Sequence, residues 1–136
     1  DYRIHIENGS MYNTPPVFPI YVSMLTMEWI KSNGGTQNME VKNKAKANLL
    51  YNEIDQNPLF VGTVDKEDRS LMNVCFLLKD SSFDKEFLEE TKKAGIDGIK
   101  GHRSVGGFRA SIYNAMPYEG VEKLVAFMKE FEENNR

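Results

Sequence analysis

Three cationic side chains and a pair of adjacent glycines, Gly106 and Gly107, gather in the short stretch "GHRSVGGFR". An arginine guanidinium donates two parallel hydrogen bonds to a carboxylate or phosphate, so Arg103 and Arg109 beside His102 suit a ligand with one or two anionic groups. Both glycines tolerate positive φ and let the chain turn the two arginines into one space. On residue types alone, an exposed charged hairpin explains the stretch equally well.

A second candidate stretch, "SMYNTPP", leads into the N-terminus of a predicted helix. Helix N-termini attract anions through free N–H groups and the helix dipole, but Pro15 and Pro16 remove two of those donors. An anion would therefore depend on the Asn13 amide and the Thr14 hydroxyl. The local sequence favours the alternative in which these two side chains cap the helix.

Composition restricts the other functions that this chain could have. It has 136 residues with 17 Lys plus Arg against 20 Asp plus Glu, so no global basic field would hold nucleic acid or an anionic membrane. The single cysteine, Cys75, cannot form an internal disulfide, and His5 and His102 are too far apart in sequence to suggest a zinc site. We expect a cytoplasmic protein without a bound metal or a membrane-spanning segment.

The first element that must position these residues is an apolar helix. Thr14 is a good N-cap and Pro15 suits the first helical position, so the helix should run to about Asn33, where Gly34 and Gly35 end it. Apolar residues cover nearly every face of this helix. It therefore needs packing partners on several sides.

A more polar helix and an antiparallel pair of strands should follow. The helix spans about residues 38–55, with its lysines outside. Its predicted inward stripe is Val41, Ala45, Leu49 and Leu50. Apolar runs at 59–64 and 71–78 predict two strands joined by a charged connection.

The C-terminal half predicts two more helices and two more strands. Ser81 has capping-box spacing before a helix over 83–94, and a short strand is expected over 96–101. In "FRASIY" the alternation places Arg109 opposite the face that carries Phe108, Ala110 and Ile112. The last helix starts at about Pro117 and is predicted to bury Val121, Leu124, Val125, Met128 and Phe131. This order predicts an α+β fold, with a small antiparallel or mixed sheet and helices packed on one face.

The stretch "KGHRSVGGFRASIYNAMPYEGVEKLVAFMKEFE" resembles the C-terminal end of the phosphoserine aminotransferase family, fold-type-I transaminases that depend on pyridoxal 5'-phosphate (PLP). The resemblance continues through "RSLMNVCFLL", "ANLLYNEID" and "WIKSNGG" to "SMYNTPP", so it covers essentially the whole chain as the C-terminal part of the family's subunit. It implies that residues 1–37 form a linking arm and apolar helix, packed on a large domain and a dimer partner. It also implies that residues 38–136 form the small C-terminal α+β domain.

The same resemblance implies roles for both candidate stretches. The family arginine at the position of Arg109 grips the substrate α-carboxylate, and the pair at His102 and Arg103 helps to bind the phosphate end. The residues at Asn13 and Thr14 reach across a homodimer interface to the PLP phosphate in the partner's site. These implications favour the ligand-binding interpretation of both stretches.

The family reaction transfers the amino group of glutamate to 3-phosphohydroxypyruvate, giving O-phosphoserine in serine biosynthesis, and similar bacterial enzymes serve pyridoxine biosynthesis. In the family, the lysine that carries PLP, the acid at its ring nitrogen and the stacking aromatic belong to the large domain upstream of residue 1. We therefore expect no catalytic residue in this chain and no transaminase activity from the 136 residues alone. The alternatives are a self-sufficient α+β module that binds a small anion without catalysis, and a different PLP transaminase with the same small domain.

Overall fold

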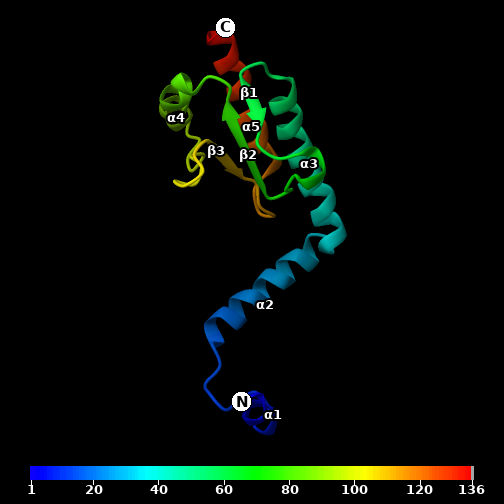
Figure 1. Ribbon diagram of the computed structural model, residues 1–136. Helices are drawn as coiled ribbons and strands as arrows, with labels where there is room; N and C mark the ends of the chain where they lie inside the picture. The colour runs from blue at the N-terminus through cyan, green and yellow to red at the C-terminus, as the bar shows by residue number, and fades with distance from the viewer. Residues whose placement is uncertain (136) are drawn as a thin grey trace. The chain divides into compact units, whose positions relative to one another are not determined.

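The computed structural model of the chain describes residues 1–135. These residues form two compact units, one over 1–38 and one from Met39 onward. The first unit contains α1 (Tyr2–Glu7), which the sequence did not predict, and α2 (Val17–Ser32) (Figure 1).

Helix α2 begins later than the sequence predicted. Its N-cap is Pro16, and no side chain caps it, so the prediction of Thr14 as N-cap was wrong. The physical reason is the double proline: a residue that precedes a proline is driven away from helical dihedrals, and this holds for both Thr14 and Pro15. Pro19 causes no break because it lies in the first turn, where the backbone N–H has no partner within the helix. No residue of α2 is buried.

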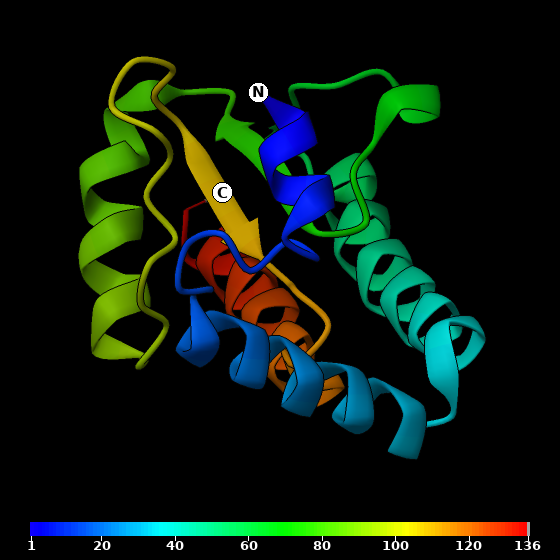
Figure 2. The ribbon, with the colours of Figure 1, turned by 90° about the horizontal axis from the view of Figure 1, so that it is seen from below.

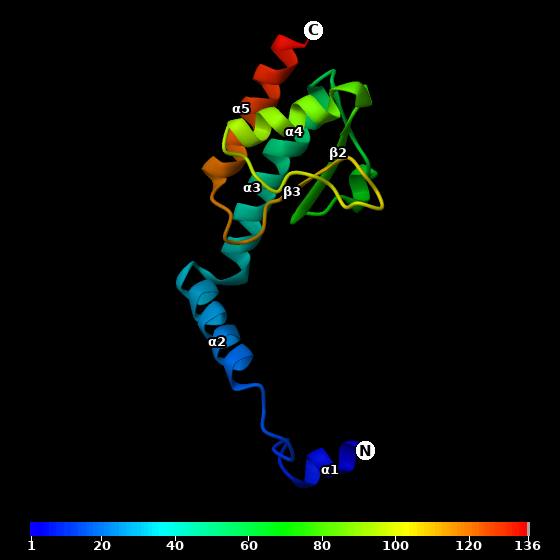
Figure 3. The ribbon, with the colours of Figure 1, turned by 90° about the vertical axis from the view of Figure 1, so that its left-hand side faces the viewer.

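The second unit is an α+β layer, as predicted. Its elements are α3 (Gly35–Gln56, which starts in the first unit), β1 (Phe60–Gly62), β2 (Asn73–Leu78), α4 (Asp84–Lys93), β3 (Phe108–Ser111) and α5 (Tyr118–Asn134). The three strands form one antiparallel sheet in the order β1-β2-β3. Figure 3 shows α3, α4 and α5 together on one side of this sheet.

The strand expected over 96–101 does not form. Only an isolated bridge joins Lys100 to Phe108, while Gly98 has a φ of 74°. A positive φ interrupts extended backbone, so this segment contributes hydrogen bonds beside β3 without becoming a fourth strand. Figure 2 shows the segment between α4 and β3, in yellow, running back beside α4 before it reverses into β3.

The core lies between the sheet and its three helices. One sheet face is buried through Phe60, Val74, Phe76, Leu78, Phe108 and Ala110. Phe87 of α4 packs at its centre, with ring centroids 4.7 Å from Phe108, 5.5 Å from Phe60 and 5.1 Å from Phe131 of α5. Edge-on aromatic contacts of this kind add to the stabilisation that comes from burying apolar area.

The predicted inward stripe of α3 was largely wrong. Val41 is 65% exposed, Ala45 is exposed and only Leu50 of the four is fully buried. The buried residues of α3 are Met39, Asn43, Lys46, Ala47, Leu50, Tyr51, Glu53 and Ile54. The inward face includes an asparagine and a lysine, so a stripe chosen from apolar positions alone selects a rotated face of the helix.

Helices α4 and α5 match the sequence more closely. All five residues predicted to be buried in α5 are buried. Helix α4 follows a short 3-10 turn, Ser81–Phe83, where the carboxylate of Asp80 accepts a hydrogen bond of 2.9 Å from the Ser82 N–H. This cap belongs to the 3-10 turn. The N-cap of α4 itself is Phe83, which makes no side-chain hydrogen bond, so the capping box expected at Ser81 does not form.

Candidate functional site

Arg109 lies on the sheet face opposite the helices. In β3 the side chains of Phe108 and Ala110 are buried, while Arg109 and Ser111 are half-buried on the other face. Arg109 is in register with Cys75 of β2, and its backbone N–H donates a 2.7 Å hydrogen bond to the Ile99 carbonyl oxygen. The backbone carrying this guanidinium is thus held from both sides.

The guanidinium of Arg109 retains hydrogen-bonding capacity for a ligand. Its Nε atom is buried and has no hydrogen-bond partner, and Arg109 forms no ion pair among the described residues. Arg109 lines a pocket of about 400 Å³ between the 96–99 segment, the end of β3 and the start of α5. A buried donor without a partner is unfavourable, and an anionic ligand would remove that penalty.

His102 and Arg103 lie in a tight turn that the glycines make possible. The Gly101 N–H donates to the Gly107 carbonyl oxygen at 2.8 Å, and the His102 carbonyl oxygen accepts from the Gly106 N–H at 2.8 Å. Gly106 and Gly107 have φ values of 79° and 62°, a conformation that favours glycine. Both cationic side chains are exposed.

The pocket beside this turn differs from the pocket of Arg109. It has a volume of about 480 Å³ and lies between the turn and α4. Its charged lining residues are Asp84, Lys85, Lys100, His102 and Arg103. The structure thus places the three predicted cations at two pockets rather than in one space.

Asn13 and Thr14 lie in the first unit, in the irregular segment before α2. Both are exposed, and no side-chain hydrogen bond caps α2. The capping alternative that the local sequence favoured is therefore wrong. The amide and the hydroxyl have hydrogen-bonding capacity that no described residue uses.

A polar row on the face of Arg109 was not singled out from the sequence. The Ser111 hydroxyl donates to the Asn73 side-chain oxygen at 3.3 Å. Hydrogen bonds with Ser111 and Asn73, with a smaller effect from the charge of Arg109, lower the pKa of Tyr113. The alternation of the strand already placed Ser111 and Tyr113 on this face, but Asn73 joins them only through the register of β2 with β3.

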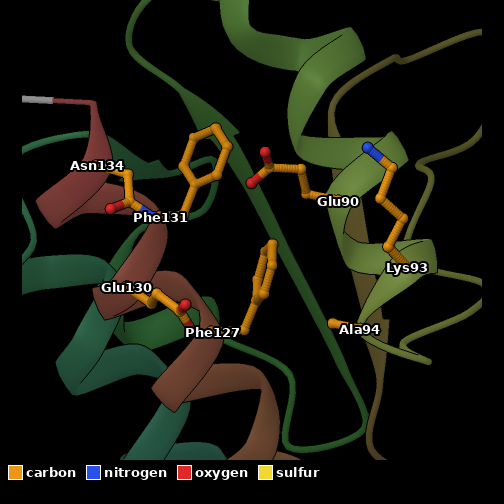
Figure 4. Close-up of a pocket in the computed structure, with 7 residues that line it drawn as sticks. All are labelled: Glu90, Lys93, Ala94, Phe127, Glu130, Phe131 and Asn134. Atoms are coloured by element: carbon orange, nitrogen blue, oxygen red, sulfur yellow. The ribbon is translucent and has the colours of Figure 1, made fainter.

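A further pocket, of about 330 Å³, lies between α4 and α5 (Figure 4). Phe127 and Phe131 point from α5 towards α4, and Glu90 extends from α4 into the space between them. None of the predicted site residues lines this pocket. Its lining has two carboxylates, Glu90 and Glu130, and one lysine, so it does not favour an anion.

Two other kinds of site are not found in the part of the chain that the structure describes. There, no cluster of three or more His, Cys, Asp or Glu residues could hold a metal ion. None of the helices over residues 1–135 is both long and apolar enough to cross a membrane.

Comparison with known proteins gives consistent matches. Residues 1–124 match the model of the aminotransferase class-V family. The chain is 57% identical over 134 residues to phosphoserine aminotransferase of Azobacteroides pseudotrichonymphae and 58% identical over 132 residues to that of Flavobacterium psychrophilum. Each alignment covers 97% of this chain and 37% of the relative.

Solved structures agree with the sequence matches. Phosphoserine aminotransferase from Bacillus circulans subsp. alkalophilus superposes with a TM-score of 0.92 at 45% identity, over 99% of this chain and 38% of that one. PLP-bound phosphoserine aminotransferase from Trichomonas vaginalis superposes with a TM-score of 0.85 at 45% identity, over 95% of this chain and 37% of that one. The chain thus spans little more than a third of the length of these relatives.

Proposed function

This chain belongs to the aminotransferase class-V family, and on that premise we propose that it is the C-terminal part of a phosphoserine aminotransferase. The observation that carries the proposal is the 57% identity to such an enzyme over 97% of the chain. The full enzyme would transfer the amino group of glutamate to 3-phosphohydroxypyruvate in the cytoplasm. It would serve serine biosynthesis and the related step of pyridoxine biosynthesis.

The placement of Arg109 at one pocket, and of His102 and Arg103 at another, supports separate roles for these residues in substrate binding. Arg109, with an unpartnered buried Nε, would bind the α-carboxylate through its planar fork. His102 and Arg103, on the exposed turn at the second pocket, would bind the phosphate. A substrate that carries both groups then gains binding energy that an unphosphorylated analogue cannot use.

The cofactor of the full enzyme would be PLP, which a solved relative is described as binding. PLP supplies the electron sink for amino transfer. Asn13 and Thr14 fit its phosphate because an amide and a hydroxyl can both donate to phosphate oxygens, and neither side chain caps α2. They would bind the phosphate in the site of a homodimer partner.

The 136 residues by themselves would not transaminate. In the resemblance that supports this proposal, the PLP lysine and its neighbours precede the segment matched here, and Arg109, His102 and Arg103 only bind and orient substrate. The catalytic machinery would be complete only in the full-length subunit.

The test is an assay of the full-length protein with phosphoserine, 2-oxoglutarate and PLP, beside the same assay on residues 1–136. We expect turnover from the full-length protein and none from residues 1–136. A different result would support the small-anion-binding module: the full-length protein shows no turnover, and it binds inorganic phosphate in a way that depends on Arg109. Turnover by residues 1–136 would refute the proposed division of function.

A further inference from the structure

Lys46 of α3 is a buried lysine with no role in the proposed substrate contacts. The residue is only 2% exposed. Its Nζ donates to the carbonyl oxygens of Ile112 at 3.1 Å, Tyr113 at 2.7 Å and Met116 at 3.0 Å. These three bonds use every N–H donor of the ammonium group.

The ammonium of Lys46 has no carboxylate partner among the described residues. Burial, with a smaller effect from the charge of Lys42, lowers its pKa. Burying a charge is unfavourable, and an apolar side chain of similar length would often serve packing as well or better. What an apolar side chain could not do is hold three carbonyl oxygens in one arrangement.

The three carbonyls belong to the segment over 112–116, which joins β3 to α5. The same segment is held at Asn114, whose side-chain oxygen accepts a 2.7 Å hydrogen bond from the Asn43 amide. Asn43 precedes Lys46 by three residues and so shares its face of α3. Helix α3 therefore holds the segment through four hydrogen bonds.

This segment adjoins Arg109 in two ways. It continues directly from β3, which pairs with β2 in the sheet. In addition, Ile112 and Met116 line the same pocket of about 400 Å³ as Arg109. Two of the three carbonyls that Lys46 holds thus belong to residues of that pocket.

We infer that Lys46 is a positioning residue for Arg109: it holds the 112–116 segment so that the end of β3 and the pocket keep the geometry that carboxylate binding needs. The inference rests on the proposed function of Arg109. Without the ammonium, each of the three carbonyl oxygens loses the hydrogen bond from Lys46, and the segment relaxes towards water. A shift of about 1 Å in a binding group is enough to weaken substrate binding and turnover substantially.

The test is Lys46→Met in the full-length enzyme. We expect KM for both phosphoserine and 2-oxoglutarate to rise about tenfold and kcat to fall less than about threefold, because both substrates offer a carboxylate to Arg109. Amide hydrogen exchange over 112–116 should become faster in the same variant. A merely structural lysine would lower the melting temperature and leave both KM values of the folded enzyme unchanged.

Two further variants keep the test decisive if Lys46→Met does not fold. Asn114→Ala removes one bond to the same segment from an exposed position, and we expect it to raise both KM values about threefold. Lys44→Met, an exposed position on α3, is the matched control and should change neither KM.

The outcomes separate the two proposals. No turnover of phosphoserine by the unmodified full-length enzyme would overturn the proposed function. If Lys46→Met is active and its KM values are unchanged, the positioning role of Lys46 is overturned while the proposed function stands. If Lys46→Met does not fold, unchanged KM values in Asn114→Ala overturn the positioning role in the same way.

Discussion

At the scale of single residues, the two arginines of the candidate site stand on different supports. Arg109 is half-buried on a strand that is paired through β2, whereas Arg103 is exposed on a glycine turn. A guanidinium on a strand is held in a defined direction, while one on a loop retains more conformational freedom. Substitution of Arg109 and substitution of Arg103 should therefore change kcat/KM for the different substrates in different ways.

Arg109→Lys should reduce kcat/KM about 100-fold for every substrate of the full-length enzyme. Lysine keeps the charge but cannot donate two parallel hydrogen bonds to a carboxylate, which all the proposed substrates carry. Steady-state kinetics with phosphoserine and with serine would measure this. A loss confined to phosphoserine would contradict the carboxylate role.

Arg103→Ala should instead act selectively. We expect kcat/KM for phosphoserine to fall at least about tenfold and that for serine to change little, because only the former has a phosphate. Lys92→Ala, which removes one exposed charge from α4 outside the pocket, is the matched control. Equal losses for both substrates would place Arg103 outside the phosphate site.

At the scale of elements, the turn before β3 depends on one glycine more than on the other. A Cβ added to Gly107 would collide with the Leu77 side chain and lie 2.9 Å from the Phe76 carbonyl oxygen, whereas a Cβ on Gly106 would meet nothing within 4 Å. Both glycines have positive φ. An alanine at either position would be strained by the positive φ, but only an alanine at position 107 would also collide with β2.

Gly107→Ala should therefore destabilise the protein by about 2–3 kcal/mol, and Gly106→Ala by only about 1 kcal/mol. Urea denaturation of the two variants beside the unmodified protein measures the difference. Equal free energies of unfolding in the two variants would show that the contact with β2 relaxes freely.

A second element-scale contact ties the connection between β1 and β2 to α3. The guanidinium of Arg69 donates two hydrogen bonds to the Asp55 carboxylate, at 2.9 Å and 2.7 Å, and lies 4.5 Å from the centroid of the Tyr51 ring. The bond from Arg69 lowers the pKa of Asp55 below its ordinary value of 3.8. The folded state thus favours the ionised carboxylate.

Asp55→Asn should cost about 1 kcal/mol of stability at pH 7. Because the folded pKa of Asp55 is depressed, the contribution of the pair is complete above about pH 4 and is lost as the pH falls through the folded pKa. The difference in free energy of unfolding between the two proteins should therefore shrink below pH 4, which denaturation at a series of pH values would measure. A constant difference down to pH 2 would exclude the ionised pair as its source.

At the scale of the whole molecule, the two units differ in whether they have a buried core of their own. The buried hydrophobic cluster lies entirely within the second unit. No residue of α2 is buried, although large apolar side chains occur along most of its length. We propose that this helix packs on a large domain and a dimer partner in the full enzyme.

Residues 39–136 should therefore unfold cooperatively as a monomer, whereas residues 1–136 should self-associate through the apolar surface of α2. Light scattering over a range of concentrations, with thermal unfolding of both polypeptides, measures this. A mass for residues 1–136 that stays monomeric at every concentration would count against the role of α2.

The sequence by itself determined the features that depend on local periodicity. The alternation in β3 predicted which face carries Arg109. The 3.6-residue repeat predicted five of the six buried residues of α5, and the apolar runs predicted the antiparallel pair β1 and β2. The sequence also showed that Gly106 and Gly107 could adopt positive φ, and both do in the structure.

Only the tertiary structure decided the buried face of α3 and the separation of the three cations into two pockets. Lys46 and Asn43 point inward because their hydrogen-bond partners lie 66 to 71 residues further along the chain. A polar side chain is buried when a distant segment supplies the bonds that water would otherwise make. No local pattern carries that information, so the residue inferred to position Arg109 looked like one more solvent-exposed lysine.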